Sequence, residues 1–442
     1  MKKKILLTLL LMLTAWLFGG CGMRSAQEMY ALPRRSQEYS QLQAAIDSAM
    51  VGLTYSAPTM GDNQQPVQMA DLDGDGVDEY LIFAADNSTR PLKVLIFIET
   101  ENGDCRLVET IESNGSAFEQ VEYVEFDDRP GCELVIGRQV SDAVLRSVSV
   151  YNFRGGSAEQ QLLIGYSKFL TCDLNQDGCS ELMVLRPGEG EIQRGMAVLY
   201  SWLDGQIQRS VETELSRDPS NIRRISQGVL QDGTPAVFVA SAVDDSAIVT
   251  DIFALQEERF ANIAYSAEAE TSIRTLRNYY VYAEDIDEDG IMELPGLIPM
   301  KPISEWQSSD QDFLLRWFSV DADGREMDKR YTFHNFTEGW YMELPSALAT
   351  RVTVDQRNQT CYFNVWDPFF EQTDLLFTVY TLTGSSREED AVSDGRFLLH
   401  RTETVVFAAK LEYGAAEYEI SEEMLKERFR LIRQDWRNGE TQ

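Results

Sequence analysis

The sequence has few basic residues and very little histidine. Its 442 residues include 39 Lys and Arg, 72 Asp and Glu, and two histidines, which gives a formal net charge of −33. A protein needs a basic surface to displace counterions from phosphates, so nucleic acid is excluded as a partner and electrostatic binding to an anionic membrane face is disfavoured. With only His334 and His400 present, a histidine-rich metal site is excluded and histidine-based catalysis is weakened.

The N-terminus lacks an apolar run long enough to cross a bilayer, which takes about 20 residues. The apolar run at 5–18 follows three lysines and precedes Gly-Gly-Cys21. This layout predicts a signal peptide over residues 1–20. Small residues before a cysteine resemble the lipobox of bacterial lipoproteins, and this resemblance implies lipidation at Cys21 and a lipidated tether over 21–36. An ordinary cleaved secretory signal, with Cys21 incidental, is the alternative.

Familiar catalytic signatures are also missing. The chain has no G-x-S-x-G elbow, no P-loop and no G-x-G-x-x-G. His334 and His400 lie in strand-like segments, so we expect structural or surface roles for both. Catalysis by paired carboxylates stays open, because 72 acids make any pair possible and none distinctive. The five cysteines after Cys21 match no zinc pattern, and we expect them to be mainly buried free thiols.

Three acid-rich segments share the pattern D-x-[DN]-x-D-G-x-x-E, at residues 71–79, 173–181 and 285–293. Oxygen ligands at positions one, three and five can converge on a hard cation, glycine at position six allows a sharp turn, and a later carboxylate closes the shell. Five carboxylates within nine residues, as in the first and third segments, repel one another unless a cation offsets them. Calcium accepts six to eight oxygens, so we expect up to three structural calcium ions. Ion-free Asp-Gly turns are the alternative.

The residues beside these segments predict strands. Position twelve is Ile82, Val184 or Gly296, so the segments are not EF-hands, which need glutamate there and helices on both sides. Short apolar runs bounded by an Asp-Gly turn predict hairpins instead. Each acid-rich loop is therefore expected to join two buried strands.

The spacing of the loops predicts a repeat. Degenerate copies near residues 125 and 228 lie midway between the complete ones, so five copies begin at intervals of about fifty residues. A period near fifty with about four strands per unit is typical of a β-propeller. We therefore predict a mainly β fold, with a β-propeller of about five four-stranded blades over 37–335, including an N-terminal helix at 37–50.

The loops resemble the calcium loops of FG-GAP and VCBS-type repeats, which occur in integrin-α-like propellers. The match covers nine loop residues and the following strand in three units. The resemblance implies calcium ligation by the side chains at positions one, three, five and nine and by the backbone carbonyl at position seven. These residues are Asp71, Asp73, Asp75, Val77 and Glu79; Asp173, Asn175, Asp177, Cys179 and Glu181; and Asp285, Asp287, Asp289, Ile291 and Glu293.

Beyond about residue 339 the pattern changes to short apolar strands followed by a helical stripe at 421–437, with Ser421 as its N-cap. This predicts a small α+β domain with a C-terminal helix over 336–442. Four tryptophans fall between residues 306 and 366, and we expect most of them to pack in the core.

These features together indicate a non-enzymatic lipoprotein of the cell envelope, extracytoplasmic and held at the membrane by lipid on Cys21. It would display a calcium-stabilised propeller that binds a protein or a carbohydrate. Two alternatives remain: a polysaccharide-active hydrolase or lyase with carboxylates in the propeller's central funnel, and a structural or assembly lipoprotein. An exposed aromatic platform would favour carbohydrate.

Overall fold

A computed structural model describes residues 37–100, 104–140, 145–188, 194–245, 247–256, 259–300, 313–367 and 372–433. The expected signal peptide, the tether and Cys21 lie outside these ranges. In the described ranges, no helix combines the length and the apolar character that a membrane span requires.

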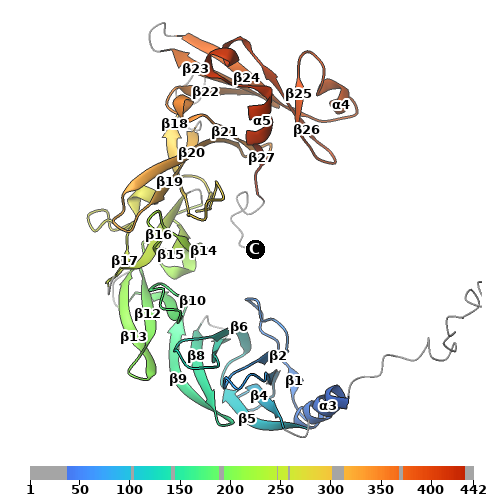
Figure 1. Cartoon of the computed structure of the whole chain (residues 1–442), viewed down its shortest axis with the longest axis vertical. Helices are drawn as coiled ribbons and strands as arrows, with labels where there is room; N and C mark the ends of the chain where they lie inside the picture. The colour runs from blue at the N-terminus through green and yellow to red at the C-terminus, as the bar shows by residue number, and fades with distance from the viewer. Residues whose placement is uncertain are drawn as a thin grey trace, which may run out of the picture. The chain divides into compact units, whose positions relative to one another are not determined.

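Strands dominate the described residues, and they form antiparallel sheets (Figure 1). The chain falls into two compact units. The first unit contains helix α3 (Gln37–Ala49) and one sheet. The strands of this sheet are β1 (Thr54–Tyr55), β2 (Val67–Ala70), β3 (Glu79–Ala85), β4 (Leu92–Glu99) and β5 (Cys105–Ser113).

Helix α3 confirms the predicted N-terminal helix. Its apolar positions recur three or four residues apart, so they share one face. Leu42 and Ile46 on that face pack against Ile82 of β3 and Leu95 of β4. The helix thereby covers one face of the first sheet.

The second unit contains five sheets among the described residues, in chain order. The first three have four strands each: β6 (Ala117–Val124), β7 (Glu133–Gln139), β8 (Arg146–Arg154) and β9 (Ser157–Tyr166); β10 (Lys168–Cys172), β11 (Glu181–Pro187), β12 (Gly195–Leu203) and β13 (Gln206–Glu214); β14 (Ile222–Val229), β15 (Pro235–Ala242), β16 (Ile248–Gln256) and β17 (Arg259–Asn262).

The last two sheets have five strands each. One runs in the order β18 (Leu294–Pro299), β19 (Phe313–Val320), β20 (Glu326–Asn335), β21 (Trp340–Leu344) and β27 (Phe429–Leu431). The other runs β22 (Val352–Arg357), β23 (Thr360–Asp367), β24 (Gln372–Leu382), β26 (Val406–Leu411) and β25 (Phe397–Arg401). Short helices complete the unit: α4 (Arg387–Asp390), α5 (Glu422–Arg428), and 3₁₀ turns at Pro219–Asn221, Ile273–Thr275, Ser346–Leu348 and Tyr413–Tyr418.

The central strands of the four-stranded sheets are apolar on both faces. In β11, residues 182–185 are all fully buried. Successive side chains of a strand point to opposite faces, so both faces of this sheet must be covered. Val184 belongs to one cluster with Val135 of the preceding sheet, and Met183 belongs to another with Val237 of the following sheet. Consecutive sheets therefore pack face to face, which a single sheet of this composition needs for stability.

The predicted repeat matches the sheets. Residues 71–78 connect β2 to β3, residues 125–132 connect β6 to β7, and residues 173–180 connect β10 to β11. The degenerate copy near 230 connects β14 to β15. The last complete copy directly precedes β18, but only an isolated bridge between Glu284 and Glu293 stands in place of a strand before it, so the expectation that this loop joins two strands is wrong. Each copy of the loop thus opens one sheet, which confirms a mainly β fold of repeated, largely four-stranded antiparallel sheets.

The C-terminal helix is shorter than the sequence predicts. Ser421 caps it as expected, since its hydroxyl accepts a hydrogen bond from Met424 N at 3.2 Å. Helix α5 then ends at Arg428, and the chain continues as β27, which pairs with β21. The prediction of a helix over 421–437 is wrong from residue 429 to the last described residue, because residues 429–431 pair with β21 and Phe429 and Ile432 are buried.

The expected boundary near residue 336 falls between β20 and β21, which pair with each other in one sheet. Phe429 of β27 stacks on Trp340 of β21, with ring centroids 5.6 Å apart. Trp340 in turn shares a core cluster with Phe363 and Phe377 of the final sheet. The last two sheets are therefore joined by a common apolar core.

Candidate functional site

The three acid-rich loops are named here the first loop (71–79), the second loop (173–181) and the third loop (285–293), and residues 125–133 form the degenerate loop. The complete loops share one backbone turn. Position four is left-handed in all three: Gly74 (φ 77°), Gln176 (φ 60°) and Glu288 (φ 61°). The glycine at position six is left-handed as well: Gly76 (φ 85°), Gly178 (φ 89°) and Gly290 (φ 86°). Glycine takes this conformation without a steric penalty, which explains the invariant Asp-Gly step of the pattern.

The glutamate at position nine holds its loop in place. Its Oε2 accepts a hydrogen bond from the backbone N–H at position two, seven residues earlier. The pairs are Glu181 with Leu174 (2.9 Å), Glu293 with Ile286 (3.1 Å) and, in the degenerate loop, Glu133 with Phe126 (3.2 Å). Because the degenerate loop keeps this bond after losing the acidic pattern, the glutamate has a structural role that does not require a cation.

Burial makes these glutamates hard to ionise without a partner. Desolvation raises the pKa of Glu181 to about 7, and the neighbouring Asp177 and Asp173 act in the same direction. Desolvation likewise raises the pKa of Glu293 to about 7. A bound cation would replace the proton that these carboxyls otherwise retain.

The structure brings some of the predicted ligands together and not others. Ligand oxygens of Asp285, Asp287 and Asp289 all lie within 4.8 Å of one another, and those of Asp71, Asp73 and Glu79 do so too. Asp75 and Glu293 are outside these groups. Among the described acids, cysteines and histidines, the second loop forms no such group, since Asn175 replaces an acid at position three. Calcium ligation by the full predicted set remains a prediction.

Several loop oxygens nevertheless lack a partner. Asp73 Oδ1, Asp173 Oδ1, Asp287 Oδ1 and Glu293 Oε1 are buried and accept no hydrogen bond from the described residues. Buried polar atoms are normally satisfied, and a hard divalent cation is the partner that clustered carboxylate oxygens accept best. The donor sets of the loops therefore fit calcium.

The remaining loop atoms support the turn. In the second loop, Asp173 Oδ2 accepts from Gly178 N at 3.1 Å and Asp177 Oδ1 accepts from Cys179 N at 2.8 Å. In the third loop, Asp289 Oδ1 accepts from Ile291 N at 2.9 Å. The N–H groups of the position-seven residues thus face the loop acids. The corresponding residue of the first loop, Val77, is half exposed.

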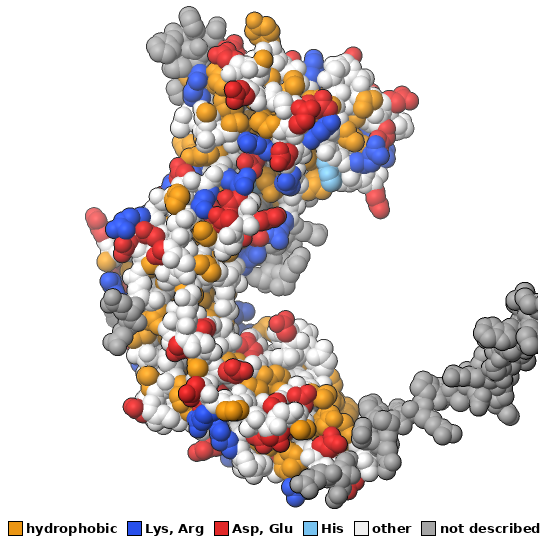
Figure 2. Space-filling model, in the orientation of Figure 1, with side chains coloured by type: hydrophobic (Ala, Val, Ile, Leu, Met, Phe, Trp, Pro, Cys, Tyr) orange, Lys and Arg blue, Asp and Glu red, His pale blue; other side chains and the backbone are white. Residues whose placement is uncertain are grey.

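Two basic side chains lie against the third loop. Lys329 Nζ is 2.8 Å from Asp289 Oδ2, and Arg330 Nε is 3.6 Å from Asp287 Oδ2. Arg330 also pairs with Glu343 at 2.7 Å. An open pocket of about 340 Å³ beside the loop is lined by side chains of both signs. Figure 2 shows acidic and basic groups close together over the sheet formed by β18 to β21.

A larger open pocket, of about 630 Å³, lies beside the second loop. Its lining combines the second loop, the degenerate loop and the β12–β13 hairpin, and includes Asp127, Asp177 and Trp202. The guanidinium of Arg129 lies over the Trp202 ring at 5.0 Å, and Arg129 Nε donates to Asp127 Oδ2 at 2.6 Å. The pocket therefore joins an aromatic ring to a group of carboxylates.

Sequence reasoning missed Trp202. The four tryptophans between residues 306 and 366 were expected to pack mainly in the core, and Trp317 and Trp340 are fully buried there. Trp306 lies outside the described residues. A usable signal existed, because Trp202 stands at the end of an apolar strand, directly before a Leu-Asp-Gly turn.

Sequence reasoning also missed a fully buried carboxylate, Asp251 on β16. Asp251 Oδ1 accepts from Ser216 Oγ (2.5 Å), Ser272 Oγ (2.6 Å) and Asn262 Nδ2 (2.8 Å), and Oδ2 accepts from Ser216 N (2.8 Å). These donors come from β17 and from two connecting segments. The network is enclosed, so we assign it to structure and not to ligand binding.

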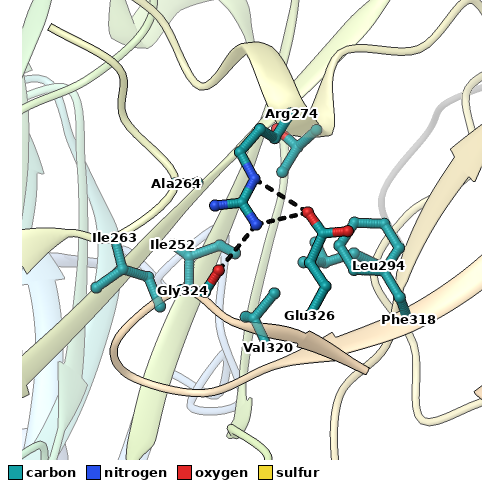
Figure 3. Close-up of a pocket in the computed structure, with 10 residues that line it drawn as sticks. Ile252, Ile263, Ala264, Arg274, Leu294, Phe318, Val320, Gly324 and Glu326 are labelled. Atoms are coloured by element: carbon teal, nitrogen blue, oxygen red, sulfur yellow. Dashed lines mark hydrogen bonds and ion pairs between the residues drawn. The ribbon is translucent and has the colours of Figure 1, made fainter. Parts of the chain in front are cut away.

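A small cavity next to this region is shown in Figure 3. Ile252, Leu294 and Phe318 line it, while Arg274 bridges Glu326 (2.6 Å) and the Gly324 carbonyl (2.8 Å) at its side. Its volume of about 10 Å³ is no more than a single water occupies. The cavity is therefore too small for a substrate.

The histidines agree with the sequence expectations, whereas the cysteines are free thiols as expected but are not mainly buried, because Cys105, Cys132 and Cys179 are partly exposed. His334 is buried, and desolvation lowers its pKa to about 3, so it is neutral and shielded at pH 7. His400 is exposed on β25. All five described cysteines are free thiols, and Cys172 and Cys361 are buried.

Comparison with known proteins gives no family assignment. No family model and no curated protein matches the chain. Solved structures with partial similarity include the exotype rhamnogalacturonan lyase YesX (12% identity, TM-score 0.28, 74% of this chain and 65% of that one) and a rhamnogalacturonan lyase from Bacillus licheniformis (13%, 0.28, 73% and 64%). A putative 6-phosphogluconolactonase from Bacteroides uniformis gives 9%, 0.29, 69% and 82%. The chain spans less than two thirds of the length of the lyases.

Proposed function

We propose that this chain is a non-enzymatic carbohydrate-binding protein of the bacterial cell envelope. Its body is a calcium-stabilised β-propeller, and lipid on Cys21 holds it at the membrane outside the cytoplasm. Support for the propeller comes from the loop copies, which recur once per sheet along five successive sheets, and from the face-to-face packing of the sheets β6–β9, β10–β13 and β14–β17 within the second unit. Support for calcium comes from the buried loop oxygens that accept no hydrogen bond.

The pocket beside the second loop carries the functional proposal. Its volume of about 630 Å³ lies within the range of about 300–1,000 Å³ of ordinary ligand sites. Trp202 is partly exposed there and offers a flat apolar ring to the face of a sugar. The exposed carboxylates of Asp128 and Asp177 are acceptors for sugar hydroxyl groups.

The charge of the pocket indicates which sugars it takes. Asp127, Asp128 and Asp177 line it, and the whole chain carries −33. Anionic sugars are therefore repelled, whereas neutral sugars and amino sugars are accepted. Arg129 lies over the Trp202 ring, and because it is also ion-paired with Asp127, this pair has to rearrange when a sugar stacks on that face of the indole.

A glycan array and calorimetric titration of neutral, amino and acidic oligosaccharides test the proposal. Binding of a neutral or amino sugar is expected, and Trp202→Ala should weaken it at least about tenfold, because stacking on the ring is lost. Tyr413→Ala is the matched control, since Tyr413 is a fully exposed aromatic residue in the C-terminal sheet region. Binding that is unchanged in Trp202→Ala would contradict the site.

The same experiments separate the alternatives. Release of reducing ends or unsaturated products during incubation would identify a hydrolase or lyase. A blank array, together with a stable protein partner recovered from membranes, would favour a structural or assembly role.

A further inference from the structure

We propose that Lys329 is a built-in counter-ion of the third loop, so that the chain itself offsets part of the loop's negative charge and weakens its binding of calcium. The loop matches the calcium pattern as well as the other two, but two acids of its pattern also pair with basic side chains of strand β20. This inference concerns the calcium sites alone and does not depend on carbohydrate binding.

The contact geometry supports the proposal. Lys329 Nζ lies 2.8 Å from Asp289 Oδ2, and the lysine side chain is only 13% exposed. Arg330 adds a second positive charge, 3.6 Å from Asp287 Oδ2. Two acids of the set at positions one, three and five are therefore already paired with cations of the protein.

The irregular geometry of strand β20 allows both Lys329 and Arg330 to contact the third loop. Neighbouring residues of a regular strand point to opposite faces, so Lys329 and Arg330 would not normally meet the same loop. The register between β19 and β20 shifts at this point, where Trp317 pairs with Arg330 and Phe318 pairs with Asp328. Lys329 is the extra residue of this β-bulge, and bulges re-aim side chains. The bulge thus accounts for two adjacent cations on one loop.

The degenerate loop shows the same device independently. Position five of the degenerate loop is Arg129, and position three is Asp127. Arg129 Nε donates to Asp127 Oδ2 at 2.6 Å. Arg129 N also donates to Asp127 Oδ1 at 2.9 Å. In contrast, no described lysine or arginine forms an ion pair with Asp173 or Asp177 of the second loop. Basic side chains of the protein therefore pair with acids of the degenerate and third loops.

The lysine ammonium competes with calcium for Asp289 because it is covalently part of the chain. It is always at the loop, whereas calcium must be captured from solution and must displace the ammonium from Asp289. A unit positive charge a few ångströms from a cation site lowers its affinity for calcium, on the order of tenfold or more even with strong screening. Removing that charge should raise the affinity of the third loop by the same factor.

The test uses the full chain with Lys329→Gln, titrated with calcium in a calorimeter at low ionic strength. We expect calcium binding at one loop to become at least about tenfold tighter than in the parent protein. In chelator, the variant should melt at a lower temperature than the parent, and calcium should restore it. Lys329→Arg keeps the charge and should behave as the parent does.

Two controls locate the effect. Lys410→Gln removes one positive charge from β26, where Lys410 pairs with Glu412, and should leave calcium binding unchanged. Adding Asp287→Asn to Lys329→Gln should abolish the gain. The proposal would be overturned if the parent and Lys329→Gln bound calcium with equal affinity. It would also be overturned if Lys410→Gln gained as much affinity, or if the gain survived the addition of Asp287→Asn. A Lys329→Gln chain that is equally unstable in chelator and in calcium would overturn it too.

Discussion

Replacing Asp251 by alanine is expected to destabilise the second unit by about 3–5 kcal/mol. Four donors converge on this carboxylate, and Ser216, Ser272 and Asn262, which supply them, are all buried. Ser216 N belongs to the backbone, so it cannot rotate toward another acceptor. The other donors keep only long alternatives, at 3.5 Å between Ser272 Oγ and Asn262 Oδ1 and 3.3 Å between Asn262 Nδ2 and the Glu214 carbonyl.

The magnitude follows from these contacts. An unsatisfied buried donor costs about 1–3 kcal/mol, and alanine leaves at least two of them. Urea unfolding followed by tryptophan fluorescence measures the loss. Ser241→Ala is the matched control on the neighbouring strand β15: its hydroxyl is fully buried and already lacks a partner, so its removal should cost almost nothing. A loss below about 1 kcal/mol for Asp251→Ala would refute the assigned role of the network.

Two further predictions concern the loops. In chelator, stability should fall as the pH rises from about 4.5 through 7, because the raised pKa values of Glu181 and Glu293 favour the protonated form in the folded state; thermal melts between pH 4.5 and 8 measure this. Calcium should remove most of this fall, and a flat profile in chelator would contradict the assigned burial. Glu133→Ala should lower the free energy of unfolding in urea by about 2–3 kcal/mol, because it removes the acceptors of Phe126 N and Asn152 Nδ2. The loss should be equal in calcium and in chelator, since the degenerate loop lacks the ligand set. A loss that depends on calcium would contradict the structural role of Glu133.

Local signals were enough to predict the repeated sheets. The Asp-Gly step specifies a left-handed turn, and the apolar run after it specifies a buried strand, so each copy of the loop marks the start of a sheet. The glutamate at position nine was predicted as a calcium ligand. In the structure, Glu181 and Glu293 also accept a hydrogen bond from a backbone N–H of their own loop.

Features that depend on distant residues were not predictable in the same way. Lys329 meets Asp289 across forty residues and through a bulge, which no periodicity reveals. Phe429 fits a helical stripe, yet pairing with β21 decides its conformation. Asp251 is one acid among 72, although its place inside an apolar strand is a signal that could have been used.

The central claim is that the acid-rich loops bind calcium and that this holds the sheets. Thermal unfolding of the whole chain in EDTA and in 1 mM calcium tests it most directly. Saturation of one site at about a hundred times its dissociation constant adds about 2.7 kcal/mol, so calcium should raise the melting temperature by on the order of 5 °C, and magnesium should not replace it. Identical melting temperatures in EDTA and in calcium would contradict the account.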